Sequence, residues 1–326
     1  MSLVRFRPEA PYHAGVAHLV ERHLAKVEVE GSSPFARSNF YTQAVTTRIN
    51  PLSLLAYLSY EDMIMKKKRI VFKVGTSTLC HGGKGLNFRN IDGLSRVLAD
   101  IKNEGHEVVL VSSGAIGAGV AKLGMKERPT DIRMKQAAAA VGQLGLMHIY
   151  DKMFGEYGAT VGQVLITKDD VDRPTVKQNL IGTFEALLSM GVIPIVNEND
   201  SVCIEEIESE QKVFGDNDTL SAVVAVLVNA DLLVILSDID GLYDSDPHKN
   251  VDAKLISFVD EIDDEIMALA GGTKSNLGTG GMVTKLSAAL LAAKGGVETV
   301  ITNGSDYRNI YLAAYGGDVG TRFVLK

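Results

Sequence analysis

Residues 69–111 read RIVFKVGTSTLCHGGKGLNFRNIDGLSRVLADIKNEGHEVVLV. The stretch opens with an apolar run at 69–74, continues with a helical period from Asn90 to Glu104 that stops at Gly105, and closes with a second apolar run at 107–111. A strand, a helix and a strand in this order are typical of a parallel βαβ unit. The pattern predicts that the two runs pair in one helix-covered sheet.

The same alternation repeats along the rest of the chain. We expect further strands at 160–166, 192–196, 231–236 and 298–302, and helices at 134–156, 175–190, 219–228 and 284–294. Because these strands are apolar almost throughout, they belong in the middle of a sheet that helices cover. The pattern therefore predicts an α/β fold with a mainly parallel sheet.

Composition narrows the class of protein. The 326 residues are 46% hydrophobic, which is ample for a buried core, and the net charge of -7 argues against a nucleic-acid partner. The two cysteines, Cys80 and Cys203, lack the spacing of a disulfide framework or a zinc site, so a cytoplasmic location is expected. No apolar run approaches the ~20 residues that a membrane span requires.

Residues 1–64 differ from the rest in having scattered prolines and no sustained period. The segments GVAHLVER at 15–22 and GSSPF at 31–35 resemble the conceptual translation of a transfer-RNA gene. Translation would then start at Met63 or Met65, and the folded domain would span residues 65–326. A disordered tail or a targeting sequence is the alternative.

Two small-residue loops follow the first two strands, where an open parallel sheet binds its ligands. In KVGTST at 73–78, Lys73 supplies a cation and Gly75 lets a phosphate approach the backbone, although the spacing is not that of a P-loop. A solvated Lys73 is the alternative. In SSGAIGAG at 112–119, backbone N–H groups could receive an anion, or the glycines could serve tight helix packing.

Two later loops carry amides and carboxylates. In PIVNENDS at 194–201, a buried strand ends in polar groups suited to an amino acid's charges, unless they only form a turn. In FGDNDTL at 214–220, an N-cap explains one of Asp216, Asn217 and Asp218 but not all three. An acidic cluster facing phosphates requires Mg²⁺ or a lysine partner.

The last two loops also suit a nucleotide. Ser237 and Asp238 end the strand in SDIDGLYDSDP at 237–247, and GTGGMVTK at 278–285 leads into a helix with Lys285 one turn inside it. A mobile surface loop with a solvated lysine is the alternative for the second.

Seven segments in this order resemble the amino-acid kinase family, and within it the members that phosphorylate glutamate. They are KVGTS, SSGAIGAG, QAAAAVGQ at 136–143, NENDSV, GDNDTLSA, SDIDGLYDSDP and GTGGMVTK. Each is weak alone, but together they are specific and span about Lys68 to Arg322. The resemblance implies a three-layer α/β/α sandwich with a glutamate-binding N-terminal lobe and an ATP-binding C-terminal lobe.

The resemblance also implies a reaction and its residues. ATP, with Mg²⁺, would phosphorylate the γ-carboxylate of L-glutamate, the first step of proline biosynthesis. Catalysis would fall to Lys73, Lys285 and Asp218. Glutamate would be held by Ser113, Asn197, Asp200, Asp216 and Asn217, and the nucleotide by Lys73, Gly75, Ser237, Asp238, Thr279, Gly280, Gly281, Met282, Val283, Thr284 and Lys285.

Further expectations concern partners and limits. The family implies a homo-oligomer, a dimer or tetramer, and proline as a feedback inhibitor. No metal ligand is identified, and the end at Lys326 predicts the class without the RNA-binding-like domain. The alternatives are another enzyme of the family, such as acetylglutamate or carbamate kinase, or a non-catalytic ligand-binding member.

Overall fold

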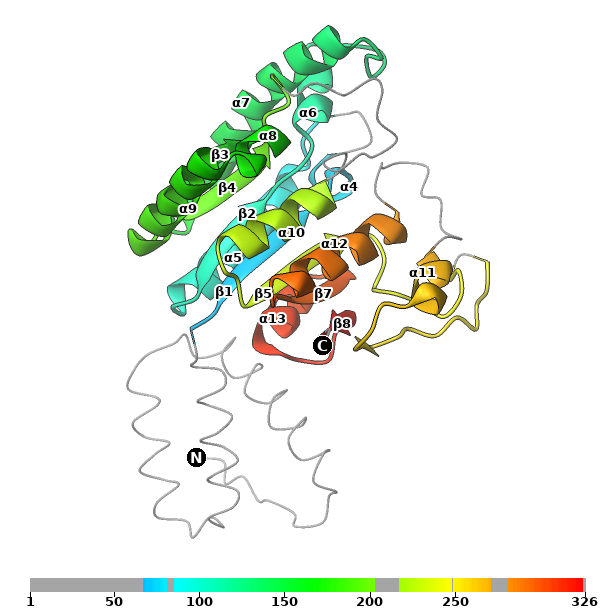
Figure 1. Cartoon of the computed structure of the whole chain (residues 1–326). Coiled ribbons are helices and arrows are strands. Elements are labelled where there is room, and N and C mark those ends of the chain that lie inside the picture. Colours follow the sequence, from blue (N-terminus) through cyan, green and yellow to red (C-terminus); the bar gives the residue numbers. More distant parts are fainter. Residues whose placement is uncertain (1–66, 81–84, 203–216, 248, 271–280, 325–326) are drawn as a thin grey trace, which may run out of the picture. The chain divides into compact units, whose positions relative to one another are not determined.

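The fold is organised around one eight-stranded sheet in the order β3-β4-β2-β1-β5-β7-β8-β6 (Figure 1). The computed structural model describes residues 67–80, 85–202, 217–247, 249–270 and 281–324, and residues 67–326 form one compact unit. The strands are β1 (Arg69–Val74), β2 (Glu107–Val111), β3 (Val161–Ile166), β4 (Ile193–Glu198), β5 (Leu232–Ser237), β6 (Phe258–Val259), β7 (Glu298–Asn303) and β8 (Thr321–Phe323).

Six of the strands run parallel to one another. β1 pairs with β2 on one side and β5 on the other, and Lys73 is aligned with Val111 and Ile235. β8 is antiparallel to β7, and β6 is parallel to β8. The carboxyl ends of β1, β2, β4 and β5 therefore meet at one edge, where α/β proteins place their ligands.

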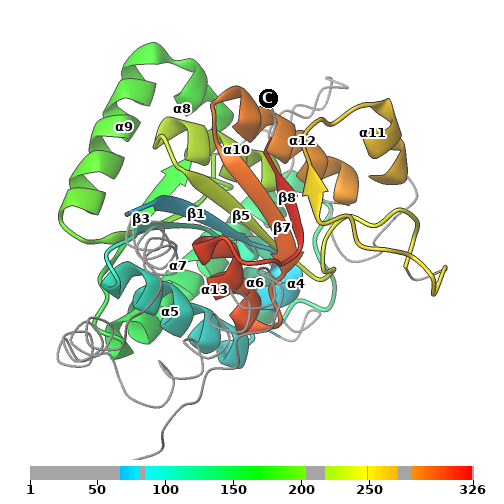
Figure 2. The ribbon, with the colours of Figure 1, turned by 90° about the horizontal axis from the view of Figure 1, so that it is seen from below.

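Helices cover both faces of the sheet, which completes three layers (Figure 2). α9 (Pro174–Ser189), α10 (Asn217–Leu227) and α12 (Met282–Lys294) pack on one face, and α5 (Phe88–Asn103), α7 (Ile132–Glu156) and α13 (Tyr307–Tyr315) on the other. Shorter helices are α4 (Thr76–Leu79), α6 (Ala115–Lys122), α8 (Lys168–Asp172) and α11 (Asp264–Ala270). The predicted α/β/α sandwich is confirmed.

The alternation of side chains along β1 aims one cation at the α10 layer. Ile70, Phe72 and Val74 belong to the core under α5 and α7, whereas Val71 belongs to the core under α10 and α12. Because successive side chains point to opposite faces of a strand, Lys73 shares the face of Val71. The end of β1 thus places the ammonium group of Lys73 beneath the start of α10.

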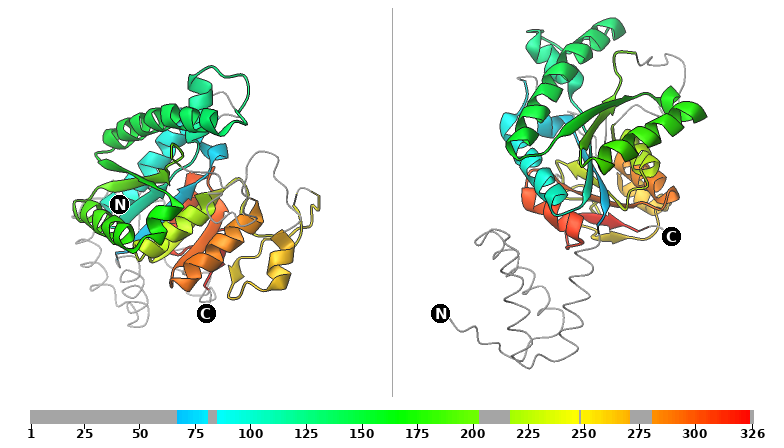
Figure 3. Two further views of the ribbon diagram at one scale, coloured as in Figure 1. Left: turned by 45° about the horizontal axis from the view of Figure 1, so that its top comes forward. Right: turned by 90° about the vertical axis from the view of Figure 1, so that its left-hand side faces the viewer.

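The helices α6 and α7 approach one another at backbone contact, side by side in the views of Figure 3. A Cβ on Gly119 would lie 1.8 Å from the Ala138 carbonyl oxygen, and a Cβ on Gly142 would lie 1.8 Å from that of Ala115. Only glycine fits at these two crossings. Tight packing, the alternative proposed for residues 112–119, therefore explains Gly119.

The sequence patterns locate the main elements closely. The expected strands and long helices end within two residues of the observed ones, whereas α4, α8, α11, α13, β6 and β8 were not expected. α10 begins at Asn217 rather than near Thr219, so Asp218 lies in the first helical turn instead of before it. The predictions for residues 1–64 lie outside the described residues, and no helix among those described is long and apolar enough to cross a membrane.

Candidate active site

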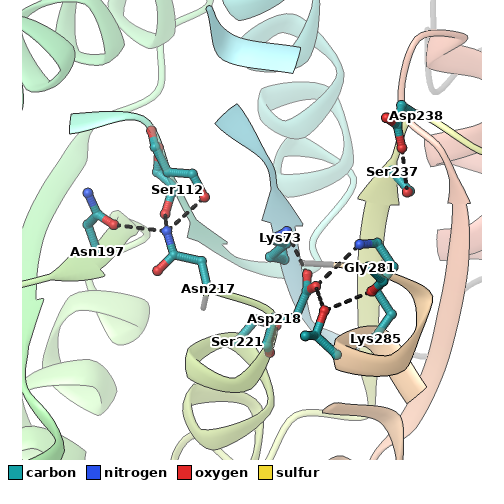
Figure 4. A network of polar contacts seen from close by, with 12 residues as sticks. Lys73, Ser112, Asn197, Asn217, Asp218, Ser221, Ser237, Asp238, Gly281 and Lys285 are labelled. Atoms are coloured by element: carbon teal, nitrogen blue, oxygen red, sulfur yellow. Dashed lines mark hydrogen bonds and ion pairs between the residues drawn. The ribbon is translucent and has the colours of Figure 1, made fainter. Parts of the chain in front are cut away.

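A buried carboxylate between two lysines lies at the carboxyl edge of the sheet (Figure 4). Lys73 Nζ on β1 is 2.6 Å from Asp218 Oδ1, and Lys285 Nζ on α12 is 3.3 Å from Asp218 Oδ2. Asp218 is 1% exposed, and each lysine is 7% exposed. We call these three residues the lysine–aspartate triad. Three elements far apart in the sequence thus place two cations on one anion.

The triad keeps Asp218 ionised. Burial alone raises the pKa of Asp218, but the charges of Lys73 and Lys285 and the hydrogen bond from Thr284 outweigh it, so the pKa of Asp218 is lower than its ordinary value. Asp218 also lies in the first turn of α10, where the helix dipole favours a negative charge. Two cations and one anion leave a net positive charge for an anionic ligand.

Threonine and serine hydroxyls fix the helix starts around Asp218. The Thr284 hydroxyl lies 2.8 Å from Asp218 Oδ2 and 2.8 Å from the Gly281 carbonyl oxygen, and it can donate its hydrogen to either oxygen. Ser221 donates to the Asp218 carbonyl oxygen at 2.6 Å. These contacts connect α12 to α10 and hold Lys285 over the carboxylate.

Beside the triad runs a chain of side-chain amides. Asn217 Nδ2 lies 2.8 Å from the Ser112 carbonyl oxygen and 2.7 Å from Ser113 Oγ. The same nitrogen lies 3.3 Å from Asn197 Oδ1, and Asn197 Nδ2 donates to Gln143 Oε1 at 2.9 Å. We call Asn217, Asn197 and Gln143 the amide chain. It brings together α10, β4 and α7.

The loop after β2 is held in place by a contact with α7. Ser112 Oγ and the buried Tyr150 hydroxyl are 2.9 Å apart, and burial raises the pKa of Tyr150. Gly114 has φ of 89°, a conformation that favours glycine, and a Cβ there would lie 3.3 Å from Cys80 Sγ. The turn therefore presents Ser113 to Asn217 from a fixed position.

Ser237 and Asp238, which are expected to meet the nucleotide, lie across the triad from Asn197 (Figure 4). Ser237 is buried at the end of β5, and its hydroxyl donates to the exposed Asp238 at 3.2 Å. Gly75 lies two residues after Lys73, and a Cβ there would lie 3.6 Å from Lys73 Nζ. Met282, Val283 and Thr284 form the first turn of α12 after Gly281.

The structure brings several of the predicted residues together. Lys73, Asp218, Thr284 and Lys285 form one polar group, and Ser113, Asn197 and Asn217 form a second; the two groups adjoin because Asn217 and Asp218 are neighbours in the sequence. Asp200 is half-buried in the turn after β4. Asp216, Thr279 and Gly280 lie outside the described residues.

Sequence reasoning gave Gln143 and Tyr150 no role. QAAAAVGQ is one of the family segments, but nothing in the motif itself indicates that its last residue contacts Asn197 near the end of β4. The helical spacing would have offered one signal: Gln143, Leu146 and Tyr150 recur at intervals of three and four residues, so they share a buried face.

A hollow of about 680 Å³ lies at the opposite edge of the sheet, where the parallel strands begin. Its lining includes Arg69, Glu107 and Asp231, which stand at or beside the beginnings of strands, together with Lys67 and Lys102. Arg69 is committed to Glu107, Glu185 and the Val228 carbonyl, so its positive charge is already paired. We therefore take the lysine–aspartate triad, rather than this hollow, as the candidate site.

Comparison with known proteins gives consistent findings. A family model described as "Amino acid kinase family" matches residues 68–303. A glutamate 5-kinase of Clostridium perfringens is 56% identical over 259 residues, 79% of this chain and 96% of that protein. One from Listeria innocua is 53% identical over 265 residues, 81% of this chain and 96% of that protein.

Solved structures support the fold. A carbamate kinase from Giardia lamblia bound to AMP-PNP aligns with a TM-score of 0.56 at 18% identity, over 80% of this chain and all of that one. A UMP kinase from Ureaplasma parvum gives 0.55 at 15% identity, over 79% and 99%. At such identities the likeness concerns the fold alone.

Proposed function

This chain belongs to the amino acid kinase family, and from that premise we propose that it transfers a phosphoryl group from ATP to the γ-carboxylate of L-glutamate at the lysine–aspartate triad. The activity is that of a glutamate 5-kinase, whose product would enter proline biosynthesis. The observation that carries the proposal is the pair of buried lysines held by one carboxylate.

Such an arrangement suits transfer between two anions. The γ-carboxylate of glutamate is ionised at pH 7, so one of its oxygens can attack the γ-phosphorus of ATP without a general base. A carboxylate O–P bond forms while the bond from the bridging oxygen to that phosphorus breaks, and ADP leaves with the electron pair. Lys73 and Lys285 neutralise the charge that spreads over the transferred group.

Asp218 positions the two lysines. Its carboxylate contacts both ammonium groups and accepts a hydrogen bond from the Thr284 hydroxyl. Both lysine side chains are therefore held in position around one anion. Because its pKa is lowered, Asp218 stays an anion and takes no proton during the reaction. We assign it a positioning role.

Glutamate is assigned to the side of Ser113, Asn197, Asp200 and Asn217, and the nucleotide to the side of Ser237, Asp238 and the start of α12. Figure 4 supports this division, since Asn197 and Ser237 stand on opposite sides of the triad. The amide groups can hold a carboxylate, and Asp200 can receive an ammonium group.

Mg²⁺ would accompany ATP. Among the described residues, no three His, Cys, Asp or Glu side chains come together as metal ligands, and the carboxylate of Asp218 is committed to the lysines. A protein cage therefore does not fit the described part of the chain. The phosphates of ATP and water are the ligands that suit the ion.

The reaction is tested by measuring ADP release with glutamate, N-acetylglutamate, aspartate and carbamate, and by trapping the acyl phosphate with hydroxylamine. We expect glutamate alone to give both signals. A response to carbamate or N-acetylglutamate would indicate another enzyme of the family, and no turnover with any acceptor would indicate a non-catalytic binding protein.

The same preparation tests the remaining assignments. We propose a dimer or tetramer, which light scattering would measure, and inhibition by proline, which would raise the KM for glutamate. A cytoplasmic location is likewise proposed and is tested by fractionating cells.

A further inference from the structure

One side chain of the amide chain has a hydrogen-bond donor with no partner. Gln143 is 9% exposed, and its Oε1 accepts the Asn197 amide, but Nε2 has no partner among the described residues. Buried polar groups are nearly always hydrogen-bonded, because an unpaired donor destabilises the fold. The exception at Gln143 requires an explanation.

The orientation of this amide follows from its neighbours. The Ser112 carbonyl can only accept, so Asn217 must turn its nitrogen toward it. The same nitrogen faces Asn197, which therefore presents its oxygen, and the Asn197 nitrogen then faces Gln143 Oε1. The chain runs in one direction and leaves an N–H group at its end.

The fold holds Gln143 in this place. Gly142 allows α7 to touch the backbone of α6 at Ala115, and Gly119 does the same at Ala138. Because backbones in contact have little freedom to shift, α7 cannot move to give Gln143 another partner. The preceding residue of the motif thus fixes the position of the donor.

The position of the donor indicates which group it meets. Asn217 adjoins Asp218 in the sequence, and Asn197 lies beyond Asn217 on the side away from Lys73 and Lys285 (Figure 4). If the γ-carboxylate lies at the lysines, the other end of an extended glutamate points along the amide chain. An N–H donor there suits a carboxylate oxygen and repels an ammonium group.

We propose that Gln143 is a specificity-determining residue whose Nε2 donates a hydrogen bond to the α-carboxylate of glutamate. The inference rests on the proposed function and names one recognition contact within it. In the structure the nitrogen is covered, so the contact requires a small turn about the terminal torsion of Gln143, which is soft in glutamine and can shift slightly without loss of the hydrogen bond from Asn197. This contact selects glutamate, because the lysines alone cannot distinguish its γ-carboxylate from the carboxylates of other molecules.

The test compares wild type with Gln143→Met, which keeps the length of the side chain and removes both hydrogen-bonding groups. The measurements are the KM for glutamate and the inhibition constants of glutarate, which has both carboxylates, and of 4-aminobutyrate, which lacks the α-carboxylate. We expect the first two constants to rise about 10- to 100-fold, the loss of a hydrogen bond to a charged group, with the third nearly unchanged.

Two further variants separate recognition from structure. Gln143→Glu keeps an acceptor for Asn197 but sets an anion against the α-carboxylate, so it should weaken glutamate at least as much as Gln143→Met. Gln178→Met, on the exposed surface of α9, is the matched control and should change nothing.

The outcomes distinguish the inference from the proposed function. Equal weakening of all three ligands in Gln143→Met, or wild-type kinetics in Gln143→Glu, would mean that Gln143 only supports Asn197 and would overturn the inference. An unchanged KM for glutamate in both variants would also overturn it. Failure of the wild-type protein to phosphorylate glutamate would instead overturn the proposed function.

Discussion

Replacing Asp218 with asparagine removes the only charge that offsets Lys73 and Lys285 within the triad. At an effective dielectric constant of ~20, unit charges at the observed separations attract by about 6 and about 5 kcal/mol, most of which offsets the desolvation of three buried groups. Breaking a buried pair by removing one partner typically costs about 3–5 kcal/mol. Because asparagine can still accept from Thr284, we expect the lower end of that range.

The assay is thermal unfolding at neutral pH, alongside the kcat for glutamate phosphorylation. A loss of about 3 kcal/mol should lower the midpoint by about 6–12 °C for a domain of this size. We expect kcat to fall by about 10²- to 10³-fold, because neither lysine is then held where charge develops. Asp172→Asn is the matched control, since that side chain is exposed on α8.

The pH dependence gives an independent check. The pKa of Asp218 is lower in the folded chain than in the unfolded one, so its contribution to stability is present above about pH 4 and is lost as pH falls through the folded value. The difference between wild type and Asp218→Asn should therefore narrow below about pH 4. A variant with the wild-type midpoint and a kcat within about twofold would refute the geometry described for the triad.

Three further changes test other parts of the site. Lys285→Ala should lower kcat by about 10²-fold or more and raise the KM for glutamate much less, since its charge acts mainly in the transition state; steady-state kinetics showing a KM change alone would contradict this. Gly142→Ala should destabilise the chain by about 1–3 kcal/mol in denaturant unfolding because its Cβ meets a carbonyl, whereas Gly155→Ala on the same helix meets nothing within 4 Å and should stabilise by up to about 1 kcal/mol; equal effects would refute the packing. Tyr150→Phe should cost about 1–2 kcal/mol in unfolding experiments by leaving Ser112 Oγ short of a buried partner, and a neutral result would contradict that hydrogen bond.

The sheet can be predicted from the sequence because the apolar composition of its main strands indicates that they are buried. RIVFKV and EVVLV are apolar except for Arg69, Lys73 and Glu107, and only a strand covered on both faces buries such runs. The last two strands toward one edge of the sheet, β8 and β6, have three and two residues, too few for a period to emerge. Asp218 was grouped with Asp216 before the helix because turn formers and first-turn acids look alike in a sequence.

Much of the site depends on proximity that no local pattern contains. Lys73 and Lys285 were identified through the order of the motifs, but their meeting on one carboxylate is a property of strand order and helix placement. Gln143 is harder still, because its partner Asn197 is 54 residues away and its donor is notable only for lacking a contact.

Asn217 and Asp218 are adjacent in the chain, yet one belongs to the amide chain and the other to the triad. The first turn of α10 therefore carries one residue of each group, and under the proposed roles a change in its backbone would disturb glutamate recognition and phosphoryl transfer together. An engineer who wished to retarget this enzyme to a different acceptor would have to leave that turn alone and work from β4 and α7, where side chains can be exchanged without moving the lysines.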